Sequence, residues 1–495
     1  MKITERYRQD RLPFFASLGF GLAAYGFCML NKIPVGDDLV ALFDKGATTV
    51  SGRYGLELLR LVMPDASMPW IYGLMSLFFL ALTVCVTLRL FAIRNRALQL
   101  LLAGALVCFP AEAGTLLYMF TAAPYALALL LTVTGLYLFI GEKRGAWLVS
   151  PLLLAFACSI YQGYFSVASS LCVVYLLVQL CRTEKCAREV FLAGVRLLAM
   201  LLLALALYGL ALLAASRLFG YPLLQEVLNE RQSVPLRLAV AYSAWLKTLL
   251  RGYFGYVPTP VSRAMHLALL LAAGIAMSAQ LRRKGQLSCL LLAGVCLLLY
   301  PLSCYCLYLL ADNSYIHSLS LYSFATLYVL CAALLDGWEA PAAPGLRRVC
   351  ALCLSVILCG SLYFANSLYL RYYLRFEELK SFYTVLLCCV FETPDYQPGD
   401  RLALVGESPA LVYDIDRHFP DAPLSLPSLE LGSAAYAELI VSRYLGFDLP
   451  FASGEEIAQL DFDGRLSDMP VYPYDGSIKK IGDTVVVMMR KEAEA

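Results

Sequence analysis

The chain has 495 residues, of which 60% are hydrophobic and only 15% are charged. Soluble domains average about 45–50% apolar and about 25% charged residues, so this composition excludes disordered, collagen-like, coiled-coil and secreted disulfide-rich classes and predicts a polytopic membrane protein. The net charge of +2 divides unevenly, because residues 1–370 hold 28 basic and 16 acidic residues (net +12) and residues 371–495 hold 11 and 21 (net −10).

Apolar runs of about 20 residues can cross a hydrocarbon core of roughly 30 Å. We expect about eleven transmembrane helices, at 13–32, 70–89, 97–112, 121–140, 146–162, 164–181, 191–215, 263–281, 287–310, 318–336 and 348–369.

The loop at 33–69 follows the first span and carries two adjacent acids, Asp37 and Asp38. A partly desolvated carboxylate at a membrane surface suits a general base, and carboxylate oxygens also bind divalent cations such as Mg²⁺ or Mn²⁺. Arg53, in the same loop, could bind a phosphate with two N–H groups. The alternative is that these acids are simply solvated loop residues.

Polar residues also interrupt the spans that follow. Glu112 is the only charged residue between 97 and 141, and either faces a cavity or marks a loop. Tyr161 and Gln162 end the fifth span, where the amide could bond a sugar hydroxyl or form a helix–helix hydrogen bond.

The long loop at 216–262 mixes aromatic and basic residues, which is typical of an interfacial helix. Within it Arg237 and Arg251 are the candidates for contacts with a lipid phosphate, and interfacial anchoring is the alternative. His317, in the loop after the ninth span, is a candidate acid or base, although a single loop histidine is more often solvated.

The last segment, 371–495, is predicted to be a separate α/β domain. It begins with a helical stretch near 372–392, and strands are expected at 401–406 and 483–489 with a helix at 433–445. The rest, 1–370, is expected to be the membrane body with outer loops 33–69 and 216–262.

Basic residues indicate the orientation of the body. Eighteen lie in one set of short loops and ten in the alternate set, six of these in the long loop 216–263. The positive-inside rule therefore predicts a cytoplasmic amino terminus and, with an odd number of spans, an extracytoplasmic acidic domain at the carboxyl end.

Several short motifs together resemble the bacterial glucosyltransferase II-like membrane enzymes of the phage serotype-conversion type. They are Gly36-Asp37-Asp38-Leu39, Ser51-Gly52-Arg53-Tyr54, Ala123-Pro124-Tyr125, Ser159-Ile160-Tyr161-Gln162-Gly163, the stretch Asn366 to Lys380 followed by Leu402 to Gly406, and Gly476-Ser477-Ile478. The resemblance leads us to expect an arginine near the loop that contains His317. The chain departs from the family here, because no arginine lies between Lys284 and Arg347.

The resemblance implies a glycosyltransferase of the GT-C class in the bacterial inner or plasma membrane. It implies a polyprenyl-phosphate sugar donor, usually glucose, and a cell-surface polysaccharide or glycolipid acceptor, as in O-antigen modification. A flippase and a polyprenyl-phosphate glucosyl synthase would supply the donor. It also assigns catalysis to Asp37 or Asp38, with Asp38 slightly favoured.

Two other functions share these features. A polysaccharide ligase or polymerase would also have an outer active site. A lipid-linked sugar transporter or flippase is disfavoured, because internal repeats and charges at mid-membrane are not visible. The sequence contains no Walker loop, no Cys/His pattern with zinc spacing and no basic tract suited to nucleic acid.

Overall fold

A computed structural model of the chain describes residues 3–35, 38–39, 51–63, 67–220, 233–251, 260–310, 318–406, 434–462 and 464–489. The chain divides into two compact units. The first, here called the body, comprises Met1–Lys32, Phe43–Leu368 and Ala422–Leu426. The second, here called the tail unit, comprises Ile33–Leu42, Tyr369–Asp421 and Pro427–Ala495.

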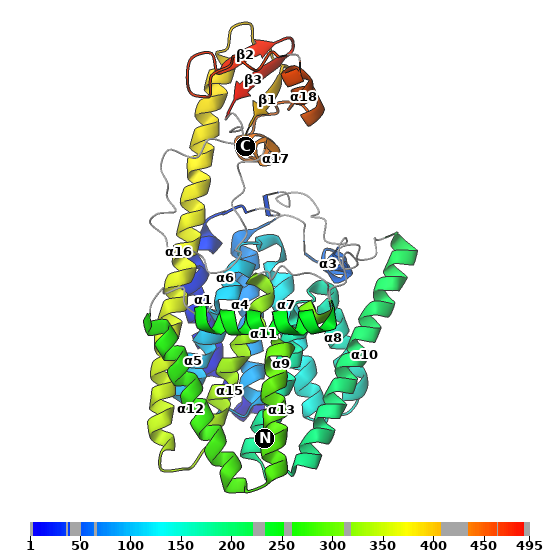
Figure 1. The fold of residues 1–495 in the computed structure, drawn as a ribbon, viewed down its shortest axis with the longest axis vertical. Helices are drawn as coiled ribbons and strands as arrows, with labels where there is room; N and C mark the ends of the chain where they lie inside the picture. Colours follow the sequence, from blue (N-terminus) through cyan, green and yellow to red (C-terminus); the bar gives the residue numbers. More distant parts are fainter. Residues whose placement is uncertain are drawn as a thin grey trace. The chain divides into compact units, whose positions relative to one another are not determined.

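All regular elements in the described part of the body are helices (Figure 1). Its helices are α1 (Ile3–Leu30), α3 (Tyr54–Leu59), α4 (Pro69–Leu90), α5 (Arg96–Val107), α6 (Pro110–Thr115), α7 (Met119–Ile140), α8 (Ala146–Ile160), α9 (Tyr164–Arg182), α10 (Ala187–Phe219), α11 (Val234–Arg251), α12 (Pro260–Lys284), α13 (Leu287–Cys304), α14 (Cys306–Leu310), η1 (Ser318–Ala325), α15 (Thr326–Leu335) and the first part of α16 (Ala343–Phe391).

Nine helices in the described part are long and apolar enough to cross a membrane, which agrees with a multi-pass membrane protein. The expected number of eleven is not confirmed. Of the two other expected spans, 146–162 contains α8, which has 15 residues and ends where Tyr161 adopts an extended backbone (φ −153°, ψ 107°). At about 1.5 Å per residue it rises roughly 22 Å, less than the hydrocarbon thickness. The other, 318–336, is a 3₁₀ segment followed by the ten-residue α15.

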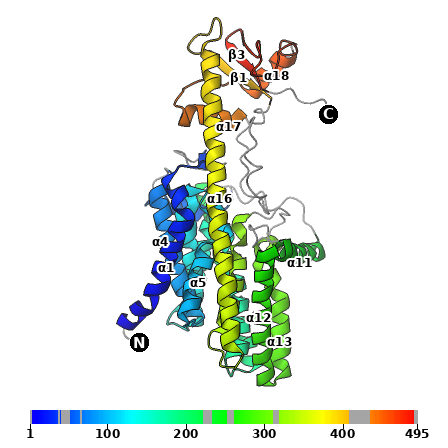
Figure 2. The same cartoon turned by 90° about the vertical axis from the view of Figure 1, so that its left-hand side faces the viewer.

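Leucine- and alanine-rich faces pack the body helices together. Helix α4 packs against α1 and α7, and α9 packs against α13 and α15. The loop before α5 is fixed by the Asp336 carboxylate, which accepts hydrogen bonds from the backbone N–H groups of Arg94 and Asn95 at 2.8 and 2.9 Å. Helix α11 differs from the others, because it runs crosswise to α12 and α13 (Figures 1 and 2).

The tail unit is built on a three-stranded sheet in the order β1-β3-β2, formed by β1 (Arg401–Val405), β2 (Ile478–Ile481) and β3 (Thr484–Met488). Strands β1 and β3 are parallel, with Leu402 opposite Val485, whereas β2 and β3 are antiparallel. Three helical segments accompany the sheet, α17 (Ala434–Leu439), the π-turn η3 (Ile440–Tyr444) and α18 (Gly454–Phe462).

Apolar side chains alternate between the two faces of this sheet and form two cores. On one face Leu402 and Val485 pack with the second part of α16 and with α17 and η3. On the other face Ala403 and Val486 pack with Leu466 and with residues of α18. The tail unit is therefore a sheet between two helical layers, and α16 runs from the body into it as one helix of 49 residues.

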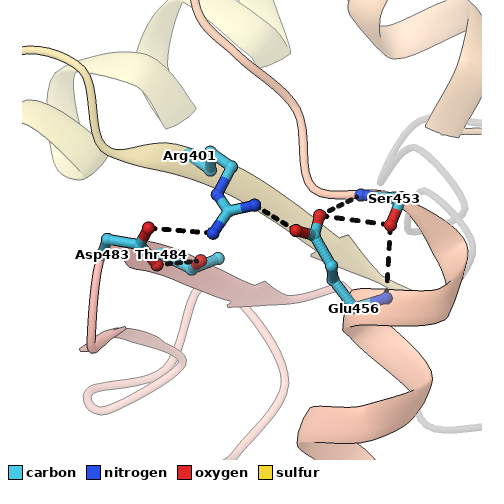
Figure 3. A network of polar contacts seen from close by, with 5 residues as sticks. All are labelled: Arg401, Ser453, Glu456, Asp483 and Thr484. Carbon is cyan, nitrogen blue, oxygen red and sulfur yellow. Dashed lines mark hydrogen bonds and ion pairs between the residues drawn. The ribbon is translucent and has the colours of Figure 1, made fainter.

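A polar network ties three parts of the tail unit together (Figure 3). Arg401, at the start of β1, bonds the carboxylate of Glu456 in α18 and that of Asp483 before β3, the latter at 2.8 Å. Glu456 also accepts hydrogen bonds from the backbone N–H and hydroxyl of Ser453, which caps α18. These bonds lower the pKa of both carboxyls, for Asp483 through Arg401 and for Glu456 mainly through the Ser453 N–H.

Candidate functional site

Arg53 lies against two stacked tyrosine rings of the body. It directly precedes α3 and follows Gly52, whose φ of 71° lets the loop turn. One guanidinium nitrogen of Arg53 donates a hydrogen bond of 2.8 Å to the Tyr125 hydroxyl. The guanidinium carbon is 5.9 Å from the ring centroid of Tyr125 and 5.4 Å from that of Tyr161, and the two rings stack at 4.3 Å. Cation–π attraction thus holds this charge in a fixed orientation.

Gln162 holds the loop that carries Arg53. It lies in the break between α8 and α9, and its amide nitrogen donates to the Ser51 carbonyl at 2.6 Å and to the Tyr208 hydroxyl at 2.9 Å. Tyr208 in turn donates to the Gly52 carbonyl at 3.2 Å. Both N–H groups of the Gln162 amide are therefore used within the protein, and their hydrogen bonds hold the loop that carries Arg53.

Glu112 is a carboxylate buried among tyrosines. It lies in α6 and is only 1% exposed. The Tyr164 phenol is the hydrogen-bonding group beside its carboxylate, although no contact of regular hydrogen-bond geometry joins them within the described residues. The Tyr164 ring meets the Tyr161 ring edge to face at 5.1 Å, so a chain of tyrosines connects Glu112 with Arg53. Burial of an acid beside a single phenol is costly, and such groups are candidates for a functional role.

Asp38 lies in the other unit. It is fully buried, its backbone N–H donates to the Val35 carbonyl at 2.8 Å, and the next residue, Leu39, belongs to the apolar core of the tail unit. Arg53, Glu112, Tyr161 and Gln162 share the body, whereas Asp38 shares the tail unit with Tyr444. Asp37 lies outside the described residues.

The remaining predicted residues are spread more widely. Arg237, in α11, donates a hydrogen bond of 3.2 Å to the Leu309 carbonyl of α14, which ties α11 to the bundle. Arg251 ends α11, and its side chain is not among those described. His317 lies outside the described residues. Within the described part of the chain no group of three or more His, Cys, Asp or Glu side chains could hold a metal ion.

Sequence reasoning did not predict the roles of Tyr125, Tyr164 and Tyr208. The chain contains 32 tyrosines, so composition does not distinguish these three. Tyr125 does stand in the Ala123-Pro124-Tyr125 motif, which was the one signal available. The hydrogen bonds of Tyr125 and Tyr208 join residues 46 to 156 positions apart, and no local pattern reports such pairings.

One comparison with known proteins identifies a family. A model of the glucosyl transferase GtrII family matches residues 26–335, which include Asp38, Arg53, Glu112 and Gln162 and end before α16. No curated protein and no solved structure matches the chain. The match covers more than half of the chain and confirms the resemblance found in its motifs. The chain therefore belongs to the GtrII glucosyl transferase family, as a multi-pass membrane protein with glycosyltransferase character.

Proposed function

We propose that this protein moves a sugar, namely glucose, from a polyprenyl-phosphate donor to a cell-surface polysaccharide or glycolipid acceptor. The observation that carries the proposal is the Arg53 guanidinium held over Tyr125 and Tyr161, within the range matched by a glucosyl transferase family. A planar guanidinium matches the oxygens of a phosphate, and aromatic rings offer apolar faces to a sugar.

The chemistry requires one base and one anion-stabilising group. The acceptor hydroxyl oxygen attacks the anomeric carbon of the donor sugar, and the bond between that carbon and the phosphate oxygen breaks. The acceptor proton passes to a carboxylate, for which we propose Asp38 with Asp37 as the alternative. The electron pair leaves with the polyprenyl phosphate, whose added charge Arg53 stabilises.

The proposal places this reaction at the outer face of the inner or plasma membrane, with a GT-C-type arrangement. Basic residues in alternate loops support a cytoplasmic amino terminus and an extracytoplasmic tail unit. A flippase and a polyprenyl-phosphate glucosyl synthase are the partners that such a donor requires. Modification of O-antigen is the process that this chemistry would serve.

An assay with purified protein tests the proposal. The protein in detergent or liposomes is incubated with polyprenyl-phosphate glucose and a lipopolysaccharide acceptor, and both lipid products and glycan masses are measured. We expect loss of the donor lipid with addition of one hexose to the acceptor. Movement of donor across the liposome membrane without bond cleavage would instead indicate a transporter. Extension from pyrophosphate-linked glycans would indicate a ligase or polymerase.

A further inference from the structure

The short segment after the first membrane helix is part of the tail unit. Leu39 has no exposed surface and packs in the core made by β1, β3 and the second part of α16, where its neighbours include Phe376 and Tyr383. Burial of a leucine side chain stabilises such a contact by about 1.5–3 kcal/mol relative to exposure. Asp38, one residue earlier, is therefore held in the tail unit rather than in a solvated loop.

Tyr444 lies in the same core and carries an unused hydroxyl. Its ring packs against Phe376 at 4.9 Å, close to edge to face, as part of the cluster that contains Leu39. The hydroxyl oxygen is buried and makes no hydrogen bond within the described residues. Tyr444 ends the π-turn η3, a type of helical insertion that is frequent at functional sites.

Packing places Tyr444 in the same cluster as Leu39, the residue next to Asp38, and the charge of Asp38 acts on its phenol. Burial raises the pKa of the phenol, the negative charge of Asp38 raises it further, and Arg443 opposes the shift. The phenol therefore stays protonated at neutral pH and can donate a hydrogen bond. A buried donor without a partner costs free energy comparable to a lost hydrogen bond, so this hydroxyl is suited to an incoming acceptor atom.

We propose that Tyr444 of the tail unit completes the site of Asp38 and donates a hydrogen bond to the acceptor sugar during transfer. This inference rests on the proposed function, in which Asp38 takes the acceptor proton. Tyr444 keeps its own proton throughout, so the balance of the transfer step is unchanged. The family match ends at residue 335, so this contribution comes from a part of the chain that the match does not cover.

The test uses the full-length protein and the variant Tyr444→Phe, which keeps the ring against Phe376 and removes only the hydroxyl. We expect kcat/KM for the acceptor to fall about tenfold, the loss of one hydrogen bond, with the KM of the donor unchanged. Tyr474→Phe is the matched control, because Tyr474 is 73% exposed in the same unit, and it is expected to keep full activity.

Two further variants make the outcome decisive. Tyr444→His keeps a ring and a hydrogen-bond donor at this position. It should therefore have higher acceptor kcat/KM than Tyr444→Phe, which separates loss of the hydrogen bond from a general folding defect. An inactive Asp38→Asn beside a fully active Tyr444→Phe would overturn the inference and leave the proposed function intact. A fully active Asp38→Asn would overturn the proposed assignment of the base itself. Equal decreases in kcat/KM for the donor and for the acceptor in Tyr444→Phe would also overturn the inference.

Discussion

Arg53 shows how single residues establish the body's site. A half-buried guanidinium beside two tyrosine rings needs hydrogen-bond partners and ring faces, and the structure supplies both through Tyr125 and Tyr161. The sequence indicated Arg53 because it is a basic residue in the same loop as the adjacent acids Asp37 and Asp38. Its ring partners come from α7 and from the α8–α9 break, which only tertiary packing brings together.

Replacement of Arg53 tests its role with the donor. Arg53→Gln removes the charge, and we expect kcat/KM for the donor to fall about 10- to 100-fold, the range of a hydrogen bond to a charged group. Arg53→Lys keeps the charge without the planar fork and should recover only part of the loss. Steady-state rates at varied donor concentration check this.

Arg60, at the opposite end of α3 from Arg53, provides the control. Arg60→Gln removes a cation that pairs with Glu57 on the same short helix, and a partly exposed pair of this kind contributes little. Donor kinetics should stay within about twofold of the wild type. Equal losses in Arg53→Gln and Arg60→Gln would mean that the helix needs positive charge in general and that Arg53 has no specific contact with phosphate.

At the level of elements, the approach of α3 to α8 positions the Arg53 loop. A Cβ atom at Gly55 would lie 2.3 Å from the Ser159 hydroxyl oxygen and 2.9 Å from the Ser159 backbone, so only glycine fits. We expect Gly55→Ala to displace α3, to destabilise the protein by about 1–3 kcal/mol and to lower transfer. Thermal unfolding in detergent and the transfer assay measure both effects.

Gly209→Ala is the matched control in α10. A Cβ there meets no atom within 4 Å, and alanine favours a helix interior by about 1 kcal/mol over glycine. This variant should be as stable as the wild type or slightly more stable. Tolerance of Gly55→Ala with wild-type activity would contradict the view that close α3–α8 packing positions Arg53.

The Arg401 network predicts how the tail unit responds to acid. Both partner carboxyls have lowered pKa values, so their pairing stabilises the fold above their ordinary titration range near pH 4 and is lost as the pH falls through the lowered values. At pH 7, Arg401→Met should speed amide exchange in β1 and β3 by up to about fivefold. The difference should vanish once the pH falls below the lowered pKa values of both carboxyls.

Lys479→Met removes the same charge from an exposed position of β2 and serves as the control. Amide exchange in β1 and β3 of this variant should match that of the wild type at pH 7 and at acidic pH. An equal acceleration in the two variants would show that net charge, rather than the Arg401 contacts, determines the stability of the sheet.

Across the whole chain, the sequence predicted the long apolar helices. It did not predict which segments pack together through contacts between residues far apart in the chain. Apolar runs located the long helices, because membrane helices must satisfy their backbone groups within one segment. The segment Ile33–Leu42 was expected to belong to the body, yet it joins the tail unit. Its partners lie more than 300 residues away along the chain, and no periodicity in residues 33–42 reports them.

The orientation of the chain can be tested with its own cysteines. Cys186, before α10, and Cys388, in the second part of α16, are both exposed. With the basic loops in the cytoplasm, a membrane-impermeant maleimide on intact cells should label Cys388 and leave Cys186 unlabelled until the cells are permeabilised. Peptide mass spectrometry locates the label, and Cys388→Ser identifies its peptide. The reverse pattern would invert the proposed topology.

We expect an acid of the segment after the first membrane helix to take the acceptor proton in the proposed sugar transfer. The direct measurement is hexose transfer from polyprenyl-phosphate glucose by the Asp37→Asn/Asp38→Asn double variant, with Asp461→Asn in exposed α18 as the control. Loss of a general base predicts a rate at least about 100-fold lower, with normal amounts of folded protein in the membrane. Wild-type transfer by the double variant would contradict the claim.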